Sequence, residues 1–368
     1  MKLERLYKTA KSGATQVFDI EVSGDTYTVT WGQRDGKMQT KSTTCKPKNV
    51  GKANETTAEE QAVLEAKAVW VKKQKSNYST SEEAPVTVKL PMKVNEYQKH
   101  KSKVKFPCYT SPKLNGVNAE YRLVDGKLVL LSRGGEEYPI PEHQRADILK
   151  VMEALTTESI NGEMYIHEEF LQDIMAATKK HNEMTPRLQF WAFDFPELDG
   201  DYASRCSYAY GVGEKLEGVS SVKFVSVGVA HSHDDIEDQW DFVTEANYEG
   251  LIIRNATGKY EYNTRSYDVL KYKQAQDSEF KVVGYSLDKN GHAVFVAETG
   301  LEDLGAKSTF KVKLKGTAEE RLAMAAEADK YIGQWLKVEY EMLSKDGIPQ
   351  KPVGIMFRKV DENGEAIE

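Results

Sequence analysis

Lys113 lies in the segment FPCYTSPKLNGVNAEYRL, between Pro112 and the turn-forming sequence Leu114-Asn115-Gly116. A lysine amine is a nucleophile once it has lost its proton, and neighbouring cations can lower its pKa enough to allow this. An alternating, strand-like pattern follows the turn. Because Asn-Gly is a common hairpin signal, this segment on its own favours a surface lysine in a β-turn.

Five more segments with chemically useful side chains follow Lys113. Together they supply arginine, glutamate, aromatic side chains and a pair of lysines. In chain order they are SRGG (132–135), NGEMYIH (161–167), FWAFDF (190–195), EGLIIRN (249–255) and VLKYK (269–273). A single KxxG motif is a weak signal, whereas five further motifs in the same order are a strong one.

This ordered set resembles the motifs of the covalent nucleotidyltransferases, which include ATP-dependent DNA ligases, RNA ligases and mRNA capping enzymes. Those proteins carry a KxDG lysine, an arginine, two glutamates, an aromatic residue and a closing KxK. The stretch from PMKVNEY to KFPCYTSPKLNG also resembles the start of the catalytic domain of small viral and bacterial ligases. The resemblance runs from about Leu90 to the C-terminal end of the sequence.

The resemblance implies a role for each charged residue. Lys113 would attack the α-phosphorus of ATP and carry AMP through a phosphoramide bond. Lys271 and Lys273, with a bound metal, would neutralise the phosphate in the transition state. Glu249 and Glu163 would bind Mg²⁺, because hard carboxylate oxygens suit that ion. Glu249 is the firmer ligand, and Glu163 alternatively contacts the ribose or acts through water.

Three more residues would contact the nucleotide by the same resemblance. Arg133 would reach the ribose or a phosphate through its fork of donors, and Phe193 would stack on adenine. Phe193 is alternatively a core strand residue. Arg254 would contact a phosphate, or else is a surface charge on a strand.

The C-terminal segment WLKVEYEMLSKDGIPQKPVGIMFRKVDENG resembles the end of the oligonucleotide-binding (OB) barrel of ligases. In that family a basic motif there moves over ATP and orients the leaving pyrophosphate. Arg358 and Lys359 stand at the matching positions. The alternative is a strand edge with exposed charges.

The sequence departs from the family pattern beside the nucleophile. Asn115 replaces the usual aspartate, and Asn118 replaces an arginine, which gives a KxxGxN pattern closer to one class of RNA ligases. Arg122, on the same strand face as Asn118, is the candidate to replace that phosphate contact. Ser111 stands where an acid or amide often reads the adenine amino group.

The elements that must position these residues indicate a mixed α+β protein. Before residue 80, the pattern QVFDIEVSGDTYTVTW predicts a hairpin, and ETTAEEQAVLEAKAVWVKKQKS predicts a helix capped by Thr56 or Thr57. Residues 76–90 read as a linker. Strands alternate irregularly after it with helices such as EHQRADILKVMEAL and EEFLQDIMAATKKH. From about Glu279 strands dominate, with one helix expected at AEERLAMAAEADKYI, which predicts a small closed barrel. The expected domains are 1–80, 81–277 (adenylation) and 278–368 (OB fold).

The N-terminal domain resembles the WGR domain of poly(ADP-ribose) polymerases. Trp31 and Gly32 match its name-giving motif, but Gln33 intrudes before Arg34. In that family the domain contacts DNA ends or partner domains. We therefore expect DNA contacts from four of its side chains and from Arg122, although Trp31 is equally well explained as packed under the helix. The four are Trp31, Arg34, Lys37 and Lys41.

Charge and composition support this organisation. The 368 residues carry a net charge of -7, yet residues 1–105 contain 20 Lys and Arg against 12 Asp and Glu. A basic N-terminal third fits either polyanion binding or a solvated lysine-rich surface. No apolar run is long enough for a membrane span or signal peptide, and three scattered cysteines form no CxxC pair. We expect a cytoplasmic monomer in a bacterium or a virus-infected cell.

The sequence therefore predicts an ATP-dependent ligase that seals nicks in duplex DNA. Two alternatives remain open at this level. Asn118 motivates an RNA-joining enzyme of the same superfamily, and Asn115 motivates a DNA-binding scaffold with an inactive nucleotide pocket. The C-terminal part lacks the four cysteines of a zinc site, which argues against an NAD-dependent ligase.

Overall fold

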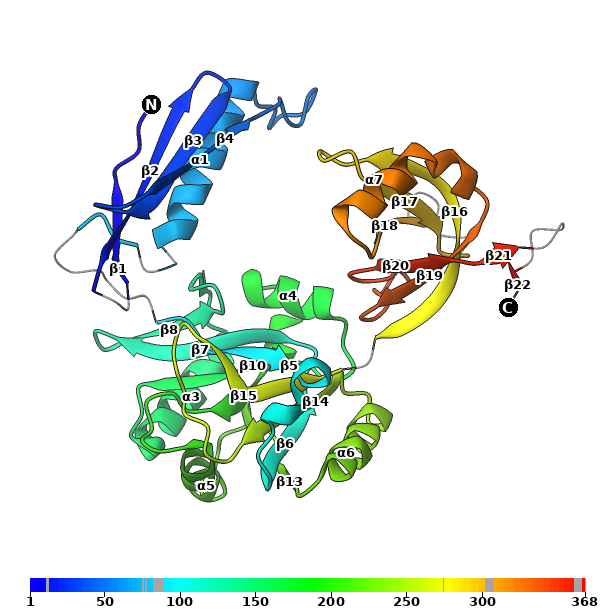
Figure 1. Cartoon of the computed structure of the whole chain (residues 1–368). Coiled ribbons are helices and arrows are strands. Elements are labelled where there is room, and N and C mark those ends of the chain that lie inside the picture. Colours follow the sequence, from blue (N-terminus) through cyan, green and yellow to red (C-terminus); the bar gives the residue numbers. More distant parts are fainter. Residues whose placement is uncertain are drawn as a thin grey trace. The chain divides into compact units, whose positions relative to one another are not determined.

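In the computed structural model the chain forms two compact units, whose helices and strands are labelled in Figure 1. The first contains Met1–Met92, Leu131–Glu137 and Glu261–Thr264, and the second contains Lys93–Leu130, Tyr138–Tyr260 and Arg265–Glu368. The described residues are 1–10, 13–74, 76, 78–81, 89–273, 275–301, 308–360 and 366–367. Most of the predicted linker at 76–90 lies outside them.

The first unit is an antiparallel sheet with one long helix. The sheet has the order β1 (Leu6–Thr9), β2 (Thr15–Ser23), β3 (Thr26–Gln33) and β4 (Met38–Thr44), and α1 spans Ala58–Gln74. This confirms the predicted hairpin and helix. The Thr57 hydroxyl accepts a hydrogen bond from the Glu60 amide at 3.2 Å, and the Glu60 carboxylate accepts one from the Thr57 amide at 2.9 Å. Thr57 therefore caps the helix.

The core of this unit follows from the period of two along β2. Phe18, Ile20 and Val22 are buried and form one cluster with Ala62 and Ala66 of α1. The small alanines allow the helix backbone to approach the sheet closely. Trp31 packs against the same cluster, as its structural interpretation predicts.

The second unit begins with a six-stranded sheet of order β12-β11-β10-β7-β8-β9. Buried Tyr121, Ile160 and Phe190 on one face form a core with Ile148 and Leu155 of α3. The strands are β7 (Val117–Val124), β8 (Lys127–Ser132), β9 (Glu137–Tyr138), β10 (Ser159–Tyr165), β11 (Gln189–Asp194) and β12 (Val222–Phe224). The helices are α3 (Glu142–Leu155), α4 (Leu171–Lys179) and α5 (Tyr202–Gly213), with a 3-10 turn at Thr185–Arg187.

A five-stranded sheet of order β13-β6-β14-β15-β5 accompanies it. Cys108, Leu251, Ile253 and Leu270 are buried on one face with Ile236 of α6, so the other face is left for polar residues. The strands are β5 (Lys93–Glu96), β6 (Cys108–Lys113), β13 (Gly228–Ala230), β14 (Gly250–Asn255) and β15 (Arg265–Tyr272). The helical pieces are α2 (Tyr97–His100), the 3-10 turn Lys101–Lys103 and α6 (His233–Glu245).

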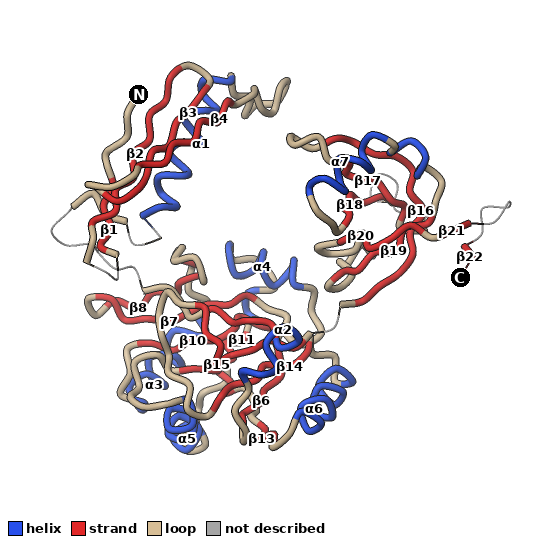
Figure 2. Tube along the Cα trace, in the orientation of Figure 1, coloured by secondary structure: helices blue, strands red, loops and turns tan. Residues whose placement is uncertain are grey.

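The predicted C-terminal barrel is confirmed as a closed barrel of order β16-β17-β18-β20-β19 (Figure 2). Its core contains Phe280, Phe295, Phe310 and Leu336. The strands are β16 (Gln276–Leu287), β17 (Ala293–Glu298), β18 (Thr309–Leu314), β19 (Trp335–Tyr340) and β20 (Val353–Phe357), and a short pair follows, β21 (Lys359–Val360) with β22 (Ala366–Ile367).

The helix predicted over AEERLAMAAEADKYI is shorter than expected. The helix α7 spans Ala318–Ala326, and a separate 3-10 turn covers Ala328–Tyr331. Ala328 is buried, and the Tyr331 ring stacks on Phe357 with centroids 4.3 Å apart. Both contacts hold the 3-10 turn against the barrel core.

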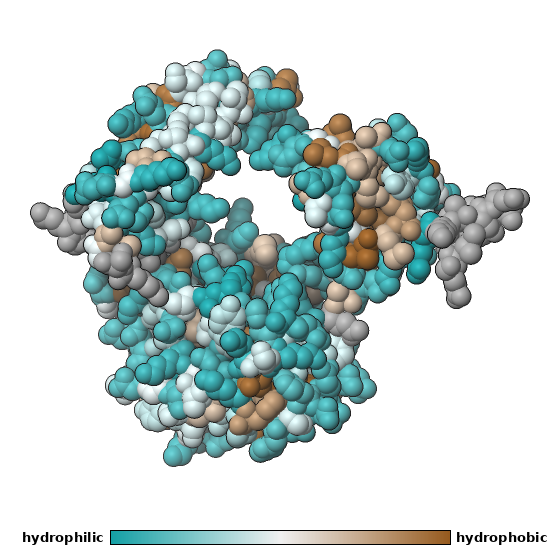
Figure 3. All heavy atoms as spheres, in the orientation of Figure 1, coloured by the Kyte–Doolittle hydropathy of each residue, from teal (hydrophilic) through white to brown (hydrophobic). Residues whose placement is uncertain are grey.

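The visible surface is largely hydrophilic, and hydrophobic side chains gather on the barrel (Figure 3). Exposed apolar residues of β20 include Val353 and Met356. Among the described residues, no helix combines the length and the apolar character that crossing a membrane requires.

The three cysteines give a direct test of this fold. Cys45, Cys108 and Cys206 are free and buried, and burial raises the pKa of Cys108 to about 11 and also raises the pKa of the other two thiols. A thiol whose pKa is raised stays protonated and unreactive at pH 8. We expect Ellman's reagent to label almost no thiol of the native protein at pH 8 and three after unfolding in guanidinium. Rapid labelling before unfolding would contradict the fold.

Candidate active site

Lys113 is the last residue of β6, and the strand register places it with the predicted lysine pair. Lys113 pairs with Gly250 of β14, while Ser111 pairs with Ile252, which pairs with Lys271 of β15. Paired residues lie on the same face of a sheet, so Lys113, Ser111 and Lys271 share the face opposite the apolar core. The KxxG and KxK motifs therefore meet through β14.

Two glycines are required by close approaches around Lys113. Gly250 has φ +148°, and an added Cβ would lie 2.2 Å from the Tyr272 carbonyl oxygen. At Gly116 an added Cβ would lie 2.5 Å from the Met164 carbonyl oxygen and 2.7 Å from Glu163 Cγ. The glycine of KLNG therefore lets the nucleophile loop pack directly on the strand that carries Glu163.

Glu249 connects two of the lysines. Lys113 Nζ donates a hydrogen bond to Glu249 Oε2, and Lys273 Nζ lies 3.5 Å from Glu249 Oε1. The side chains of Lys113, Glu249 and Lys273 are 21%, 11% and 18% exposed, so their charges are only partly screened by water. The Glu249 amide also donates to the Lys113 carbonyl oxygen at 3.0 Å, which fixes the carboxylate beside the nucleophile.

Lys271 adds a third cation to this face. Its Nζ lies 3.9 Å from Glu96, and burial, followed by the ammonium of Lys273, lowers its pKa below the ordinary value. A hydrogen bond from Lys99 holds the pKa of Glu96 below its usual range. Each of the three partly buried lysines is paired with a carboxylate, and a polyphosphate that binds them would compete with those carboxylates for their ammonium groups.

Glu163 lies on β10, in register with Asn118 of β7 and Trp191 of β11. The Asn118 amide nitrogen donates to the Gly162 carbonyl oxygen at 3.4 Å. Its Oδ1 is buried and has no hydrogen-bond partner among the described residues. That acceptor suits a ligand hydroxyl or amine.

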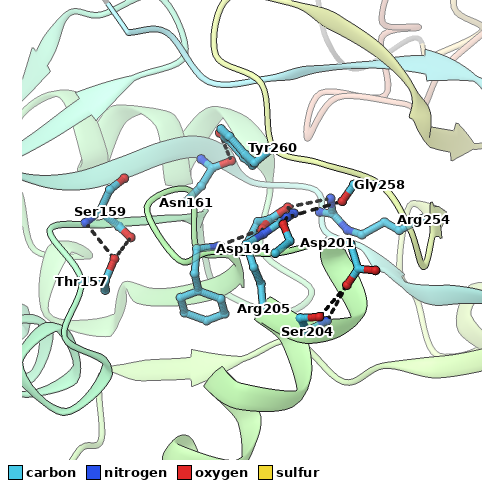
Figure 4. Close-up of polar contacts among 12 residues, drawn as sticks. Thr157, Ser159, Asn161, Asp194, Asp201, Ser204, Arg205, Arg254, Gly258 and Tyr260 are labelled. Atoms are coloured by element: carbon cyan, nitrogen blue, oxygen red, sulfur yellow. Dashed lines mark hydrogen bonds and ion pairs between the residues drawn. The ribbon is translucent and has the colours of Figure 1, made fainter.

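Arg254 lies in a buried charged cluster with Asp194 and Arg205 (Figure 4), and Phe193 lies beside it. Arg254 Nη1 lies 3.4 Å from Asp194 Oδ2, and its guanidinium lies 5.3 Å from the Phe193 ring centroid. Arg205 of α5 binds the same carboxylate, Nε to Oδ1, at 3.0 Å, and also donates to the Gly200 and Gly258 carbonyl oxygens. Asp194 thus holds both arginines, of which Arg254 lies next to Phe193.

Burial limits the contacts that the side chain of Arg254 is able to make. The residue is 6% exposed, and its Nε is buried without a partner among the described residues. Two guanidiniums against one carboxylate leave a net positive charge in this cluster. The geometry favours a positioning role beside Phe193, and the predicted nucleotide contacts of Arg254 and Phe193 stay predictions.

The arginines expected elsewhere in the site have other partners or positions. Arg122 is paired with buried Glu120, Nη2 to Oε1, at 2.7 Å, which favours a structural role over a DNA contact. Arg133 is exposed in the turn between β8 and β9. In the barrel, Arg358 is paired with Glu279, while the side chain of Lys359 lies outside the described part of the chain. The functional contacts proposed for these residues stay predictions.

In the first unit, the predicted DNA-contacting residues divide into two groups. Trp31 is half-buried against the core, whereas Lys37 and Lys41 are exposed in the β3–β4 turn and on β4. Arg34 is exposed, with its guanidinium 5.5 Å from the Tyr7 ring centroid. The two lysines are therefore the better candidates for phosphate contacts.

Several residues that shape the site were not found from the sequence. Asp194 and Arg205 form the buried cluster, and Glu96 and Glu341 pair with Lys271 and Lys273. Only Asp194 carried a local signal, because it follows Phe193 directly. Glu96 and Glu341 lie in segments that carry the family resemblance but were not singled out there, and Arg205 lies in a segment without a motif.

The donor set suits a hard divalent cation held partly by substrate. Within the described residues, no group of three or more His, Cys, Asp or Glu side chains gathers as a metal cage. Mg²⁺ is typically bound by one or two carboxylates together with substrate phosphates and water. Glu249, 11% exposed and facing the lysines, fits that sparse arrangement.

Comparisons with known proteins point to one family. Residues 88–273 match the family described as ATP dependent DNA ligase domain. A DNA ligase of African swine fever virus (isolate Warthog/Namibia/Wart80/1980) is 28% identical over 344 residues, with 85% of this chain and 78% of the relative covered. A DNA ligase of Enterobacteria phage T6 is 25% identical over 308 residues, with 66% and 62% covered.

Solved structures agree on the fold. A Lig E DNA ligase superposes with a TM-score of 0.58 at 20% identity, covering 74% of this chain and all of its own. The structure titled Pmar-Lig_PreS3 has a TM-score of 0.63 at 18% identity, with 73% and 67% covered. The mixed α+β fold therefore resembles the nucleotidyltransferase and OB-fold domains of ATP-dependent ligases. Since the matched segment spans half of the chain and contains Lys113, Glu249 and Lys273, the chain belongs to the ATP-dependent DNA ligase family.

Proposed function

We infer that the protein is an ATP-dependent DNA ligase that carries AMP on Lys113 and seals nicks between a 5′-phosphate and a 3′-hydroxyl in duplex DNA. The observation that carries the inference is the convergence of Lys113, Glu249 and Lys273 from three strands or strand ends in one partly buried site. The test is joining of a nicked duplex in the presence of ATP.

The reaction begins with the amine of Lys113. After losing a proton, its nitrogen attacks the α-phosphorus of ATP, the N–P bond forms, and the bond to pyrophosphate breaks. Lys271 and Lys273, on the same face, stabilise the charge on the phosphates as it moves to the leaving group. AMP then passes to the 5′-phosphate at the nick, and the 3′-hydroxyl displaces AMP as the phosphodiester forms.

Glu249 and Glu163 are the residues proposed to hold Mg²⁺. When bound, that ion supplies Lewis-acid neutralisation of phosphate oxygens. Glu249 is also placed to orient Lys113 and Lys273, since it contacts both ammonium groups. Phe193 is proposed to stack on adenine from the edge of the Asp194 cluster.

The RNA-joining and inactive-scaffold alternatives are not favoured, because the relatives described above are DNA ligases. A competition assay with matched nicked DNA and nicked RNA duplexes separates the substrates. We expect the DNA nick to be sealed in preference. Preferential joining of an RNA strand with a 3′-hydroxyl would overturn the substrate assignment.

The WGR-like first unit is proposed to grip DNA through exposed lysines such as Lys37 and Lys41. Each lysine that neutralises a phosphate releases a counterion, so it contributes about 0.9 to the slope of log affinity against log salt. We expect the variant with both lysines changed to alanine, or deletion of residues 1–80, to weaken nick binding and flatten that slope while self-adenylylation persists. Fluorescence anisotropy over a salt series measures it.

Lys223→Ala is the matched control, because Lys223 is an exposed lysine on β12 of the second unit. It should leave affinity and slope near wild type. Equal slopes for wild type and the Lys37/Lys41 variant would count against the proposed grip.

A further inference from the structure

A hairpin that follows β19 lies against the active site. Residues 341–351, here the 341–351 hairpin, are held by hydrogen bonds from the Glu341 amide to the Gln350 carbonyl oxygen at 3.0 Å and from the Gln350 amide to the Met342 carbonyl oxygen at 2.8 Å. The Gly347 amide closes its turn by donating to the Ser344 carbonyl oxygen. The hairpin and the lysine site belong to the same compact unit.

Besides the ion pair between Glu341 and Lys273, the hairpin makes two further contacts. Lys345 Nζ lies 3.0 Å from Asp173 Oδ1 of α4, and the Asn115 amide nitrogen donates to Met342 Sδ at 3.4 Å. A thioether sulfur only accepts hydrogen bonds, so the amide of Asn115 makes a contact that an ionised aspartate cannot make. This gives a physical reason for one departure from the family pattern.

The contact with the greatest consequence joins Glu341 to Lys273. Lys273 Nζ lies 2.5 Å from Glu341 Oε1 and 3.5 Å from Glu249 Oε1, so Glu341 is its closer partner. The second oxygen of Glu341 lies 2.6 Å from Lys351 Nζ. Burial raises the pKa of Glu341, but hydrogen bonds from Lys273 and Lys351 more than offset it and hold that pKa below its ordinary value.

A phosphate that binds Lys273 must compete with this carboxylate. Glu341 is 29% exposed and Lys273 is 18% exposed, so the ion pair is partly desolvated. The electrostatic attraction between the two charges is therefore stronger than in a fully solvated surface pair. Once a phosphate holds Lys273, the carboxylate has been displaced and no longer affects the later chemistry. Such a partner affects the binding of ATP and leaves the rate at saturation unchanged.

We propose that Glu341 is a positioning residue that occupies Lys273 in the nucleotide-free enzyme and thereby sets the ATP concentration needed for self-adenylylation. The proposal rests on the proposed function, because it assigns Lys273 to the phosphates of ATP. Glu341 acts only through Lys273. Lys351 weakens the hold of Glu341 on Lys273, because the ammonium of Lys351 binds the same carboxylate.

The test is single-turnover formation of the lysyl-AMP adduct over a series of ATP concentrations at fixed Mg²⁺. Glu341→Gln keeps the size of the side chain and removes its charge. We expect the KM for ATP to fall about two- to fivefold, the effect of one partly exposed ion pair, with the maximal rate unchanged. Glu341→Asp keeps the charge and should restore a KM near that of wild type.

Lys351→Gln is the matched control with the opposite sign. It removes the other partner of Glu341 and leaves more of the carboxylate's charge on Lys273, so the KM for ATP should rise. A general disturbance of the hairpin would move the KM of Glu341→Gln and of Lys351→Gln in the same direction. Thermal unfolding midpoints near wild type show that the variants fold.

An unchanged or higher KM for ATP in Glu341→Gln would overturn the proposal, as would parallel shifts in the two variants. Failure of the proposed function looks different: wild type itself would then form no adduct at Lys113. The two outcomes are therefore distinguishable in one experiment.

Discussion

Lys113→Ala is expected to abolish transfer of labelled AMP from ATP to the protein while leaving the chain folded. An alanine has no nucleophilic nitrogen, and the other two amines of the site, Lys271 and Lys273, come from β15 or its end and are paired with carboxylates. Folding should survive because Glu249 keeps Lys273 as a partner, so its carboxylate is not left buried and unpaired. Denaturing gel electrophoresis after incubation with labelled ATP and Mg²⁺ measures the transfer.

Lys113→Arg separates charge from nucleophilicity. It keeps a cation beside Glu249, but a guanidinium is always protonated and does not attack the α-phosphorus. We expect no label on this variant either. Label that survives either substitution at the wild-type level would support the inactive-pocket alternative or another nucleophile.

Glu249→Gln is expected to slow self-adenylylation about a hundredfold, the usual scale for loss of one preorganised electrostatic group in an active site. Lys113 and Lys273 lose the carboxylate that holds both of them, and the site loses one of its two proposed Mg²⁺ ligands. The amide keeps the size of the side chain. Rates of adduct formation over a Mg²⁺ series measure the effect, and a higher Mg²⁺ requirement is expected in the variant.

Glu245→Gln is the control for that substitution, since Glu245 is an exposed glutamate at the end of α6. It should behave like wild type in rate and Mg²⁺ dependence. A rate for Glu249→Gln within about twofold of wild type, at unchanged Mg²⁺ dependence, would remove Glu249 from the proposed machinery.

Local patterns predicted most of the architecture correctly. Alternation on either side of Ser23-Gly24-Asp25 predicted the β2–β3 hairpin, and EHQRADILKVMEAL corresponds to α3 at Glu142–Leu155. The strand-rich sequence after Glu279 predicted the barrel, which is closed by the pairing of β16 with β19. These features depend on period and turn chemistry, which a short window of sequence contains.

Motif order also predicted which residues meet at the nucleophile. More than a hundred residues of sequence separate Lys113 from Glu249 and Lys273. The strands β6, β14 and β15, which carry or flank these residues, are nevertheless hydrogen-bonded neighbours. That prediction came from the resemblance to the ligases, because the periodicity of a single segment does not indicate which strands pair with one another. The roles assigned to Arg133, Arg358 and Lys359 have no such geometric support.

The remaining site depends on partners brought together by tertiary structure. Arg205 stands in YASRCSYAYGVG, a segment without a clear helical period, and only its burial against Asp194 reveals a role. Glu341 lies 68 residues beyond Lys273, and its pairing depends on how the 341–351 hairpin packs. Arg122 is tied to Glu120 because both point to the same side of β7, two residues apart. The pairings of Arg205 and Glu341 depend on tertiary packing, whereas that of Arg122 is local to one strand.

The most direct test of the account is peptide mapping by mass spectrometry of wild-type protein incubated with ATP and Mg²⁺, under conditions in which nicked DNA is joined. The account predicts one AMP adduct, on the peptide that contains Lys113, and its loss when nicked DNA is added without further ATP. Joining of the nick with no adduct on Lys113, or an adduct on another lysine, would contradict it.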